Sequence, residues 1–377
     1  MLHENQRHKL LFKPIGYTKI HKMTVHTEFM YRCFQLARKG EGFTHPNPMV
    51  GAVVVHDGKI IGEGFHRRYG DPHAEVNAIA AVRDTSLLRH STLYVSLEPC
   101  SHHGKKPPCT ELITEKAIPK VVVATRDPNP QVAGKGVAWM RERGIEVVEG
   151  ILEEEAHTLN RAFFVNQLFE RPYVILKWAQ SRDGFMDRIR NSREEQPAKL
   201  SNELTSCLAH RLRAWVQGVM VGTQTALLDD PKLTVRHWYG QQPTRVVIDR
   251  TNRVPNDSAL FNGSAPTIVF TQSVSPARNK MPGVKQVEID FSNEAIRQVL
   301  RRLYDEEIRT LLVEGGSQLL SYFIQQQLWD EAYVETSDKV LHSGIKAPGI
   351  DGQTISNERF LHATRLHLKN QITRNFL

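Results

Sequence analysis

Hydrophobic residues recur in two separate stretches of this chain, and each stretch predicts a layered α/β domain. In the first stretch, apolar residues on one side of 27–38 predict a helix. Apolar runs at 51–55 and 60–64, joined by Asp57-Gly58, predict a β-hairpin. Further strands are predicted at 92–97, 120–125 and 146–148, and helices at 73–82, 108–116 and 132–143. A hairpin followed by alternating strands and helices indicates an α/β domain with one mixed sheet packed between helices.

A second alternating series follows a helical linker at 151–171, which contains an acidic run. Its strands are predicted at 173–178, 218–221, 245–248, 267–270, 309–313 and 331–335, and its helices at 204–214, 295–303 and 318–327. With 377 residues, two domains are the natural expectation. We therefore expect a flexible extension at 1–22, a first domain at 23–168 and a second α/β domain at 172–377.

Composition narrows the class of protein. The chain has 40% hydrophobic and 24% charged residues, as globular proteins do. No apolar run approaches the roughly 18 residues of a membrane span, so no membrane association is expected. The four cysteines are too scattered for a disulfide framework, which favours a cytoplasmic protein.

The charge balance points to acidic partners. A net charge of +8 suits either nucleic acid or small phosphorylated substrates, or a merely solvated basic surface. No RNA-binding module is evident, so we expect a small-molecule substrate and no nucleic-acid partner. The first 22 residues contain one acid, Glu4, among several basic residues, which indicates either an extension or a true start at Met23.

Four residues in the first stretch suggest a catalytic metal centre. His73, Cys100 and Cys109 offer one imidazole and two thiolates, which are three ligands of a tetrahedral zinc with its fourth position open to water. Glu75, beside the histidine, would be the proton shuttle and hence the catalytic carboxylate. A histidine-x-glutamate followed by proline-cysteine is the signature of zinc-dependent nucleobase deaminases.

Other interpretations of these residues remain open. Each element alone could be structural, as a helix-start histidine or a buried thiol. His102 and His103 are rival ligands between the cysteines. A zinc that only held the fold would need a fourth protein ligand. A nucleic-acid base deaminase with an accessory domain is the alternative enzyme.

The long loop between the cysteines resembles the pyrimidine deaminase of riboflavin biosynthesis. The resemblance is carried by 97–109, 44–51 and 126–136. It implies a cytidine-deaminase-like fold for the first domain, and zinc-dependent hydrolysis of an amino group on 2,5-diamino-6-ribosylamino-4(3H)-pyrimidinone 5′-phosphate. It also implies that Asn47 hydrogen-bonds the substrate, although a turn former between prolines is a simple alternative.

The second domain contains a strand passing through Gly315 and Gly316 into a helix, which would let backbone amides approach a phosphate. The pattern is weak alone, and no complete G-x-G-x-x-G motif occurs. However, 176–184, 221–236 and 312–317 resemble the NADPH-dependent reductase domain that follows this deaminase in bifunctional riboflavin enzymes. That resemblance implies a dihydrofolate-reductase-like fold, and reduction of the ribosyl to the ribityl group.

The resemblance also implies site residues in the second domain. Those bordering the cofactor would be Ala179, Thr225, Asp229 and the segment starting at Gly316. Those facing the substrate would be Arg213, Leu233, Arg236 and Glu314, with weaker support for Lys177. Arginines suit a phosphate because guanidinium groups bind its oxygens in pairs.

One segment departs from this family. Lys199 stands where many members have tryptophan, within a divergent stretch at 191–202. The resemblance therefore does not predict which residues of this stretch contact the cofactor. We expect a homodimer formed through the second domain.

Overall fold

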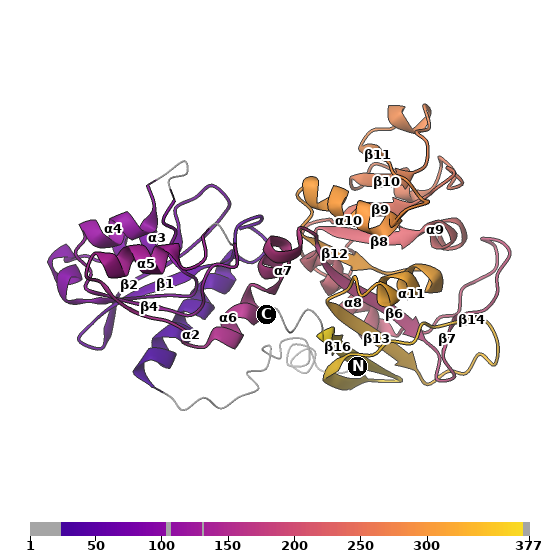
Figure 1. The fold of residues 1–377 in the computed structure, drawn as a ribbon. Coiled ribbons are helices and arrows are strands. Elements are labelled where there is room, and N and C mark those ends of the chain that lie inside the picture. Colours follow the sequence, from indigo (N-terminus) through magenta and orange to yellow (C-terminus); the bar gives the residue numbers. More distant parts are fainter. Residues whose placement is uncertain (1–23, 103–106, 130–131, 372–377) are drawn as a thin grey trace. The chain divides into compact units, whose positions relative to one another are not determined.

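The structure is a computed structural model that describes residues 24–102, 107–129 and 132–371. The expected extension at 1–22 and His103 lie outside the described residues. The chain divides into two compact units, residues 1–160 and 161–377 (Figure 1). Each unit is an α/β layer structure of its own.

The first unit is built on a five-stranded mixed sheet with the order β2-β1-β3-β4-β5. Its strands are β1 (Gly51–His56), β2 (Lys59–Phe65), β3 (Thr92–Val95), β4 (Lys120–Val123) and β5 (Glu146–Val148). β1 pairs antiparallel with both β2 and β3, whereas β3, β4 and β5 are parallel. The predicted hairpin and mixed sheet are confirmed.

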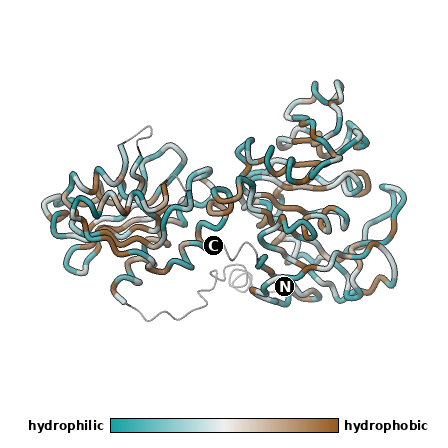
Figure 2. Tube along the Cα trace, viewed as in Figure 1, coloured by the Kyte–Doolittle hydropathy of each residue, from teal (hydrophilic) through white to brown (hydrophobic). Residues whose placement is uncertain are grey.

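Helices cover both faces of this sheet (Figure 1). One face carries α2 (Val25–Ala37) and α6 (Glu153–Leu159), and the other carries α3 (Ala74–Ala80), α4 (Cys109–Glu115) and α5 (Lys135–Glu142). Alternation along β1 serves both layers: Val53 packs towards α2, and Val54 packs towards α3. Figure 2 shows the resulting apolar strands between the helices.

Glycines let α3 lie directly on strand β2. A Cβ atom at Gly64 would come within 2.3 Å of Ala78 N and 2.4 Å of Ala74 O. Only glycine permits this approach, which fixes the start of α3 and therefore His73.

The second unit contains a nine-stranded sheet with the order β11-β10-β9-β8-β12-β6-β13-β16-β15. The strands are β6 (Tyr173–Gln180), β8 (Gly218–Gly222), β9 (Thr244–Ile248), β10 (Thr267–Thr271), β11 (Val284–Glu288), β12 (Thr310–Val313), β13 (Glu331–Ser337), β15 (Gln353–Phe360) and β16 (Ala363–Lys369). The strands from β11 to β13 are parallel, and β16 and β15 add antiparallel pairs at one edge. β7 (Phe185–Asp187) and β14 (Ile345–Lys346) form a separate two-stranded sheet.

Helices also pack on both faces of the large sheet. α10 (Ala295–Asp305) and α11 (Ser317–Gln325) cover one face, and α7 (Arg161–Phe169), α8 (Glu203–Trp215) and α9 (Thr223–Asp229) cover the other. The first domain is predicted to extend to residue 168. In the structure the second unit already begins at residue 161, and Ala162 and Val165 of α7 belong to the same buried cluster as Tyr173 of that unit.

Two local features follow from backbone geometry. The helix predicted from 132 starts only at Lys135, because Gly134 adopts the left-handed conformation (φ 73°) immediately before it. Among the described residues, no helix is both long and apolar enough to cross a membrane.

Candidate zinc centre and nucleotide-binding edge

His73 and Glu75 are brought to one place by the start of α3. His73 is the N-cap, with extended backbone (φ −68°, ψ 165°), and Glu75 lies in the first helical turn. Residues two apart would diverge on a continuous helix, but the extended N-cap removes that restriction. His73 is solvent-exposed, whereas the Glu75 side chain is buried.

The two cysteines meet His73 from a different segment. His73 Nδ1 lies 3.5 Å from Cys100 Sγ and 3.3 Å from Cys109 Sγ. Cys109 is the first residue of α4, and its N–H donates to Cys100 Sγ (3.3 Å). The N–H of Thr110 also donates to Cys100 O (3.2 Å), so the start of α4 holds Cys100 in place.

These donors fit zinc. The three ligand atoms lie within 4.8 Å of one another, and His73, Cys100 and Cys109 are the candidate metal cluster that the described part of the chain contains. A tetrahedral zinc with bonds of roughly 2.1 Å to nitrogen and 2.3 Å to sulfur keeps those atoms about 3.6 Å apart. The observed separations of 3.3 and 3.5 Å are close to that value. His102, the rival ligand that the structure describes, is not in the cluster.

Hydrogen bonding and burial shift the pKa values in this cluster in different directions, and they raise the pKa of Cys109, the hydrogen-bonded partner of Cys100. Hydrogen bonding with Cys109 lowers the pKa of Cys100 to about 4, assisted by His73. Burial raises the pKa of Glu75. Glu75 also hydrogen-bonds the Cys109 side chain, so the carboxyl lies beside the cluster without belonging to it.

Glu98, which was not among the predicted site residues, holds the segment before Cys100 in place. Its buried carboxylate accepts N–H hydrogen bonds from Gly134 (2.9 Å), Gly136 (2.9 Å) and Val137 (3.1 Å) at the start of α5, and from Asp127 (3.2 Å). A carboxylate is favourable there because helix N-termini carry unpaired N–H groups and positive partial charge. Glu98 belongs to the motif at 97–109. Its position between a predicted strand and the ligand Cys100 is the sequence feature that could have pointed to its role.

Asn47 is connected to the zinc cluster by a second histidine, His66, which was not among the predicted site residues. Asn47 Nδ2 is 3.1 Å from His66 Nε2, and the His66 ring packs edge-on against His73 with centroids 5.7 Å apart. His66 Nδ1 is 3.2 Å from Pro72 O. Because a carbonyl only accepts, His66 donates from Nδ1 and accepts from Asn47 at Nε2. The Asn47 amide oxygen is thereby turned away from His66.

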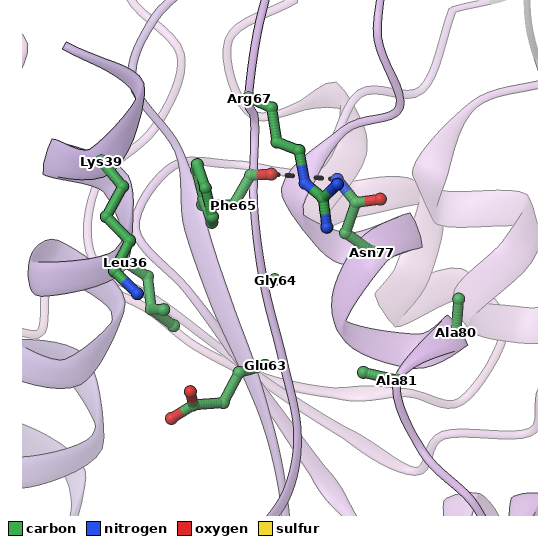
Figure 3. Close-up of a pocket in the computed structure, with 9 residues that line it drawn as sticks. All are labelled: Leu36, Lys39, Glu63, Gly64, Phe65, Arg67, Asn77, Ala80 and Ala81. Carbon is green, nitrogen blue, oxygen red and sulfur yellow. Dashed lines mark hydrogen bonds between the residues drawn. The ribbon is translucent and has the colours of Figure 1, made fainter.

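A cavity of about 400 Å³ lies elsewhere on this unit (Figure 3). It is lined by the end of α2, by β2 and by α3, and none of the cluster residues contributes to it. Lys39 and Arg67 lie 5.8 and 5.9 Å from the Phe65 ring centroid. Asn77 Nδ2 donates to Phe65 O (2.9 Å) and ties α3 to the end of β2. The cavity is therefore distinct from the zinc cluster.

In the second unit, a glycine turn leads from β12 into α11. A Cβ atom at Gly315 would come within 2.9 Å of the Thr225 side chain, and Gly316 has a positive φ of 79°. This turn therefore requires glycine. Glycine at the N-cap also has no side chain to cap the first N–H groups of α11. Such a cradle fits the pyrophosphate of a dinucleotide cofactor.

Arg213 and Glu314, both predicted as substrate-facing, form a buried ion pair. Arg213 Nε and Nη2 donate to the two Glu314 oxygens at 2.7 and 2.6 Å. Arg213 Nη1 donates to Thr234 O (3.2 Å). Arg213 lowers the pKa of Glu314, with Lys177 contributing, so the carboxylate stays ionised. This pair thus forms a fixed wall of the site.

Arg236 lies beside that pair with fewer partners. Its Nη1 donates to Thr234 Oγ1 (3.0 Å), and its N–H donates to His210 Nδ1 (3.0 Å). Burial and the neighbouring charge of Arg213 lower the pKa of Arg236. Two arginines around one carboxylate leave positive charge in excess, which suits a phosphate.

Three further residues of the second unit were predicted to contact the cofactor or the substrate. Ala179 lies on β6, opposite Glu335 of β13. Asp229 ends α9, and its carboxylate pairs with the buried Arg190. Leu233 is in the core with a positive φ of 51°, so a ligand contact there would come from its backbone.

The pH dependence of stability should report on His210. Burial, followed by the charges of Arg213 and Arg236, lowers the pKa of His210 from 6.5 to about 4, while Glu314 acts in the opposite direction. As the pH falls, the unfolded chain protonates this histidine before the folded protein does. The contribution of neutral His210 to the free energy of unfolding is therefore complete above pH 6.5 and is lost as the pH falls towards 4. We expect wild type to lose up to about 1.4 kcal/mol per pH unit from this group in that window.

Urea unfolding followed by fluorescence between pH 7.5 and 4.5 measures this slope. His210→Asn keeps an acceptor for Arg236 N–H but does not titrate, so its stability should fall less steeply. Equal slopes for the two proteins would contradict the prediction.

Comparisons with known proteins agree with this geometry. Residues 23–125 match the cytidine and deoxycytidylate deaminase zinc-binding region, and residues 172–370 match the RibD C-terminal domain. The riboflavin biosynthesis protein RibD of Aquifex aeolicus is 41% identical over 84% of this chain and 88% of the relative, and that of Escherichia coli is 35% identical over 86% and 91%.

Solved structures give the same result. The diaminohydroxyphosphoribosylaminopyrimidine deaminase/5-amino-6-(5-phosphoribosylamino)uracil reductase of Thermotoga maritima is 38% identical, with a TM-score of 0.79 over 92% of this chain and 99% of that one. Acinetobacter baumannii RibD is 33% identical, with a TM-score of 0.80 over 92% and 98%.

Fold and site together define a two-domain enzyme, in which a zinc-dependent deaminase unit is followed by an NADPH-dependent reductase unit. The chain belongs to the RibD family of riboflavin biosynthesis proteins.

Proposed function

We propose that this chain catalyses two consecutive reactions of riboflavin biosynthesis. The first unit removes the 2-amino group of 2,5-diamino-6-ribosylamino-4(3H)-pyrimidinone 5′-phosphate by hydrolysis. The second unit reduces the ribosyl group of the deaminated nucleotide to ribityl with NADPH. The observation that carries the proposal is the convergence of His73, Cys100 and Cys109 beside the buried Glu75, in a chain that also has the reductase unit.

For deamination, His73, Cys100 and Cys109 would hold the zinc ion. When bound, such an ion would supply a water molecule whose pKa is lowered from about 15.7 towards 7. Glu75 would carry one proton from the attacking water to the ring nitrogen, and a second proton, from the new hydroxyl group, to the amino group that leaves as ammonia. Burial supports this role, because it raises the pKa of Glu75, which is the direction that a proton donor requires. The Asn47 amide, oriented by His66, hydrogen-bonds the pyrimidine.

For reduction, bound NADPH would supply the hydride for the sugar carbon that becomes the ribityl CH₂, while the bond of that carbon to the ring oxygen breaks and the oxygen takes up a proton. The Gly316 turn would hold the cofactor phosphates, and Ala179, Thr225 and Asp229 would border the cofactor. Arg236 and Arg213 bind the substrate phosphate, while Glu314 keeps Arg213 in place. Leu233 contacts the substrate through its backbone.

Two further properties belong to this proposal. The chain forms a homodimer through the second unit, and it acts in the cytoplasm, where its scattered cysteines stay reduced. The alternative of a nucleic-acid base deaminase gains no specific support from the site.

The test follows the two reactions separately. Purified zinc-loaded protein is incubated with the diaminopyrimidine nucleotide, first without and then with NADPH. We expect ammonia release in both incubations and loss of NADPH absorbance only after deamination. NADPH oxidation that ignores the deaminated nucleotide would contradict the reductase assignment, and absence of ammonia would contradict the deaminase assignment.

A further inference from the structure

The carboxyl end of β9 is next to the cofactor cradle. β12, β8 and β9 are neighbouring parallel strands, so their carboxyl ends lie along one edge of the sheet. Ligands of open parallel sheets bind at this edge. Two strand spacings separate β9 from β12, which is roughly 10 Å. A dinucleotide whose pyrophosphate lies at Gly316 therefore has its adenosine ribose within reach of the residues that follow β9.

Asp249, the first of these residues, is not available to a ligand. Its carboxylate is fully buried and accepts from Arg278 Nη1 (2.8 Å) and from the N–H groups of Arg253 (2.9 Å) and Val254 (3.0 Å). In dinucleotide sites, an acid near this point binds the free ribose 2′-hydroxyl of NADH, whereas an arginine accommodates the 2′-phosphate of NADPH. Here the acid is neutralised by Arg278 and braces the loop instead.

Arg250, the next residue, is exposed on that braced loop. Its carbonyl oxygen accepts from Gln272 N–H (2.9 Å) and Thr271 Oγ1 (3.2 Å), which anchors the backbone to the end of β10. Its guanidinium Nε donates to the neutral Gln272 Oε1 (2.9 Å). The nearby acid Asp290 feels the charge of Arg250, which helps to lower its pKa, but its carboxylate accepts its hydrogen bonds from Ser292 N–H (2.8 Å) and Oγ–H (2.6 Å). The guanidinium also lies 5.7 Å from the Phe291 ring centroid. Within the described part of the chain, Nη1 and Nη2 of Arg250 make no hydrogen bond, so these donors are available to an anion.

We propose that Arg250 selects NADPH over NADH by binding the phosphate on the adenosine ribose. The inference rests on the proposed reductase function and adds a specificity residue to it. The site for this phosphate consists of the anchored loop, the buried Asp249 that Arg278 neutralises, and the exposed Arg250 guanidinium, which is hydrogen-bonded to the neutral Gln272. The preference for NADPH comes from charge-assisted hydrogen bonds that NADH cannot form.

Binding of adenosine 2′,5′-bisphosphate (2′,5′-ADP) and 5′-ADP to the full-length, zinc-loaded protein, measured by calorimetry, tests this role without turnover. Arg250→Ser should weaken 2′,5′-ADP binding about 10- to 100-fold and leave 5′-ADP binding within about twofold. Arg253→Ser is the matched control, because that side chain is exposed on the same loop; it should change neither affinity appreciably.

Kinetics provide the second measurement. In Arg250→Ser, the ratio of kcat/KM for NADPH to that for NADH should fall by a similar factor through KM, with kcat for NADPH and ammonia release retained. Unchanged 2′,5′-ADP affinity in Arg250→Ser, or equal affinity of wild type for the two probes, would overturn the inference. Wild type that binds 2′,5′-ADP through Arg250 but never reduces the deaminated nucleotide would instead contradict the proposed function.

Discussion

Ammonia release should fall by about 10²- to 10⁴-fold in Glu75→Gln, the range that general acid–base groups supply. Glutamine has nearly the same shape but can neither take nor deliver the proton. The ligand atoms of His73, Cys100 and Cys109 are unchanged, so zinc should remain bound at wild-type stoichiometry. Steady-state ammonia assays and metal analysis of the purified variant measure both quantities.

Two controls keep this result interpretable. Glu115→Gln removes an exposed carboxylate of α4 that pairs with the adjacent Lys116, and its deamination rate should match wild type. NADPH oxidation by Glu75→Gln, assayed with previously deaminated nucleotide, should also be unchanged. Normal ammonia release from a zinc-loaded Glu75→Gln protein would refute the catalytic role and favour a structural zinc.

Loss of Arg213 should have the largest effect on the second unit. Arg213→Met leaves the buried Glu314 carboxylate without its bidentate partner, so we expect a destabilisation of about 3–5 kcal/mol. In the double variant Arg213→Met/Glu314→Gln, much of this loss should be recovered because no unpaired carboxylate remains. Urea unfolding of the single and double variants gives the coupling energy.

An exposed ion pair provides the comparison. Arg301 pairs with Glu170, with side chains 52% and 63% exposed, so Arg301→Met should destabilise the protein far less than Arg213→Met does. Reduction should be lost in Arg213→Met even at temperatures where the protein is folded, since the proposed substrate site would lose one of its two phosphate-binding arginines. A destabilisation as small as that of Arg301→Met would show that the Arg213–Glu314 pair is not maintained in solution.

Much of the fold could be predicted where burial imposes a simple pattern. Strands such as β1, β8 and β12 are buried on both faces, and their apolar runs identify them. The hairpin of β15 and β16 was not predicted, because residues of β15 are mostly exposed or half-buried and their sequence is polar. α9 has only seven residues, too few for a helical period to be recognised.

The candidate site divides along a similar line. His73, Cys100, Cys109 and Glu75 were predicted because metal chemistry limits the residue types that can form such a cluster. His66 and Glu98 were not, since their roles depend on partners distant in sequence: Glu98 acts through residues at 134–137 and His66 through Asn47. Such tertiary partners leave no local pattern in the sequence.

The carboxylate of Glu98 has a consequence for protein engineering. A designer who transplants the cysteine loop into a foreign scaffold would move two of the three ligands but leave behind His73 and the helix whose amides hold the residues before Cys100. Gly136 must travel with that helix, since a methyl group at that position would collide with Pro99 O at 2.2 Å. The smallest portable unit of this metal centre is therefore three segments: the start of α3, the cysteine loop and the start of α5.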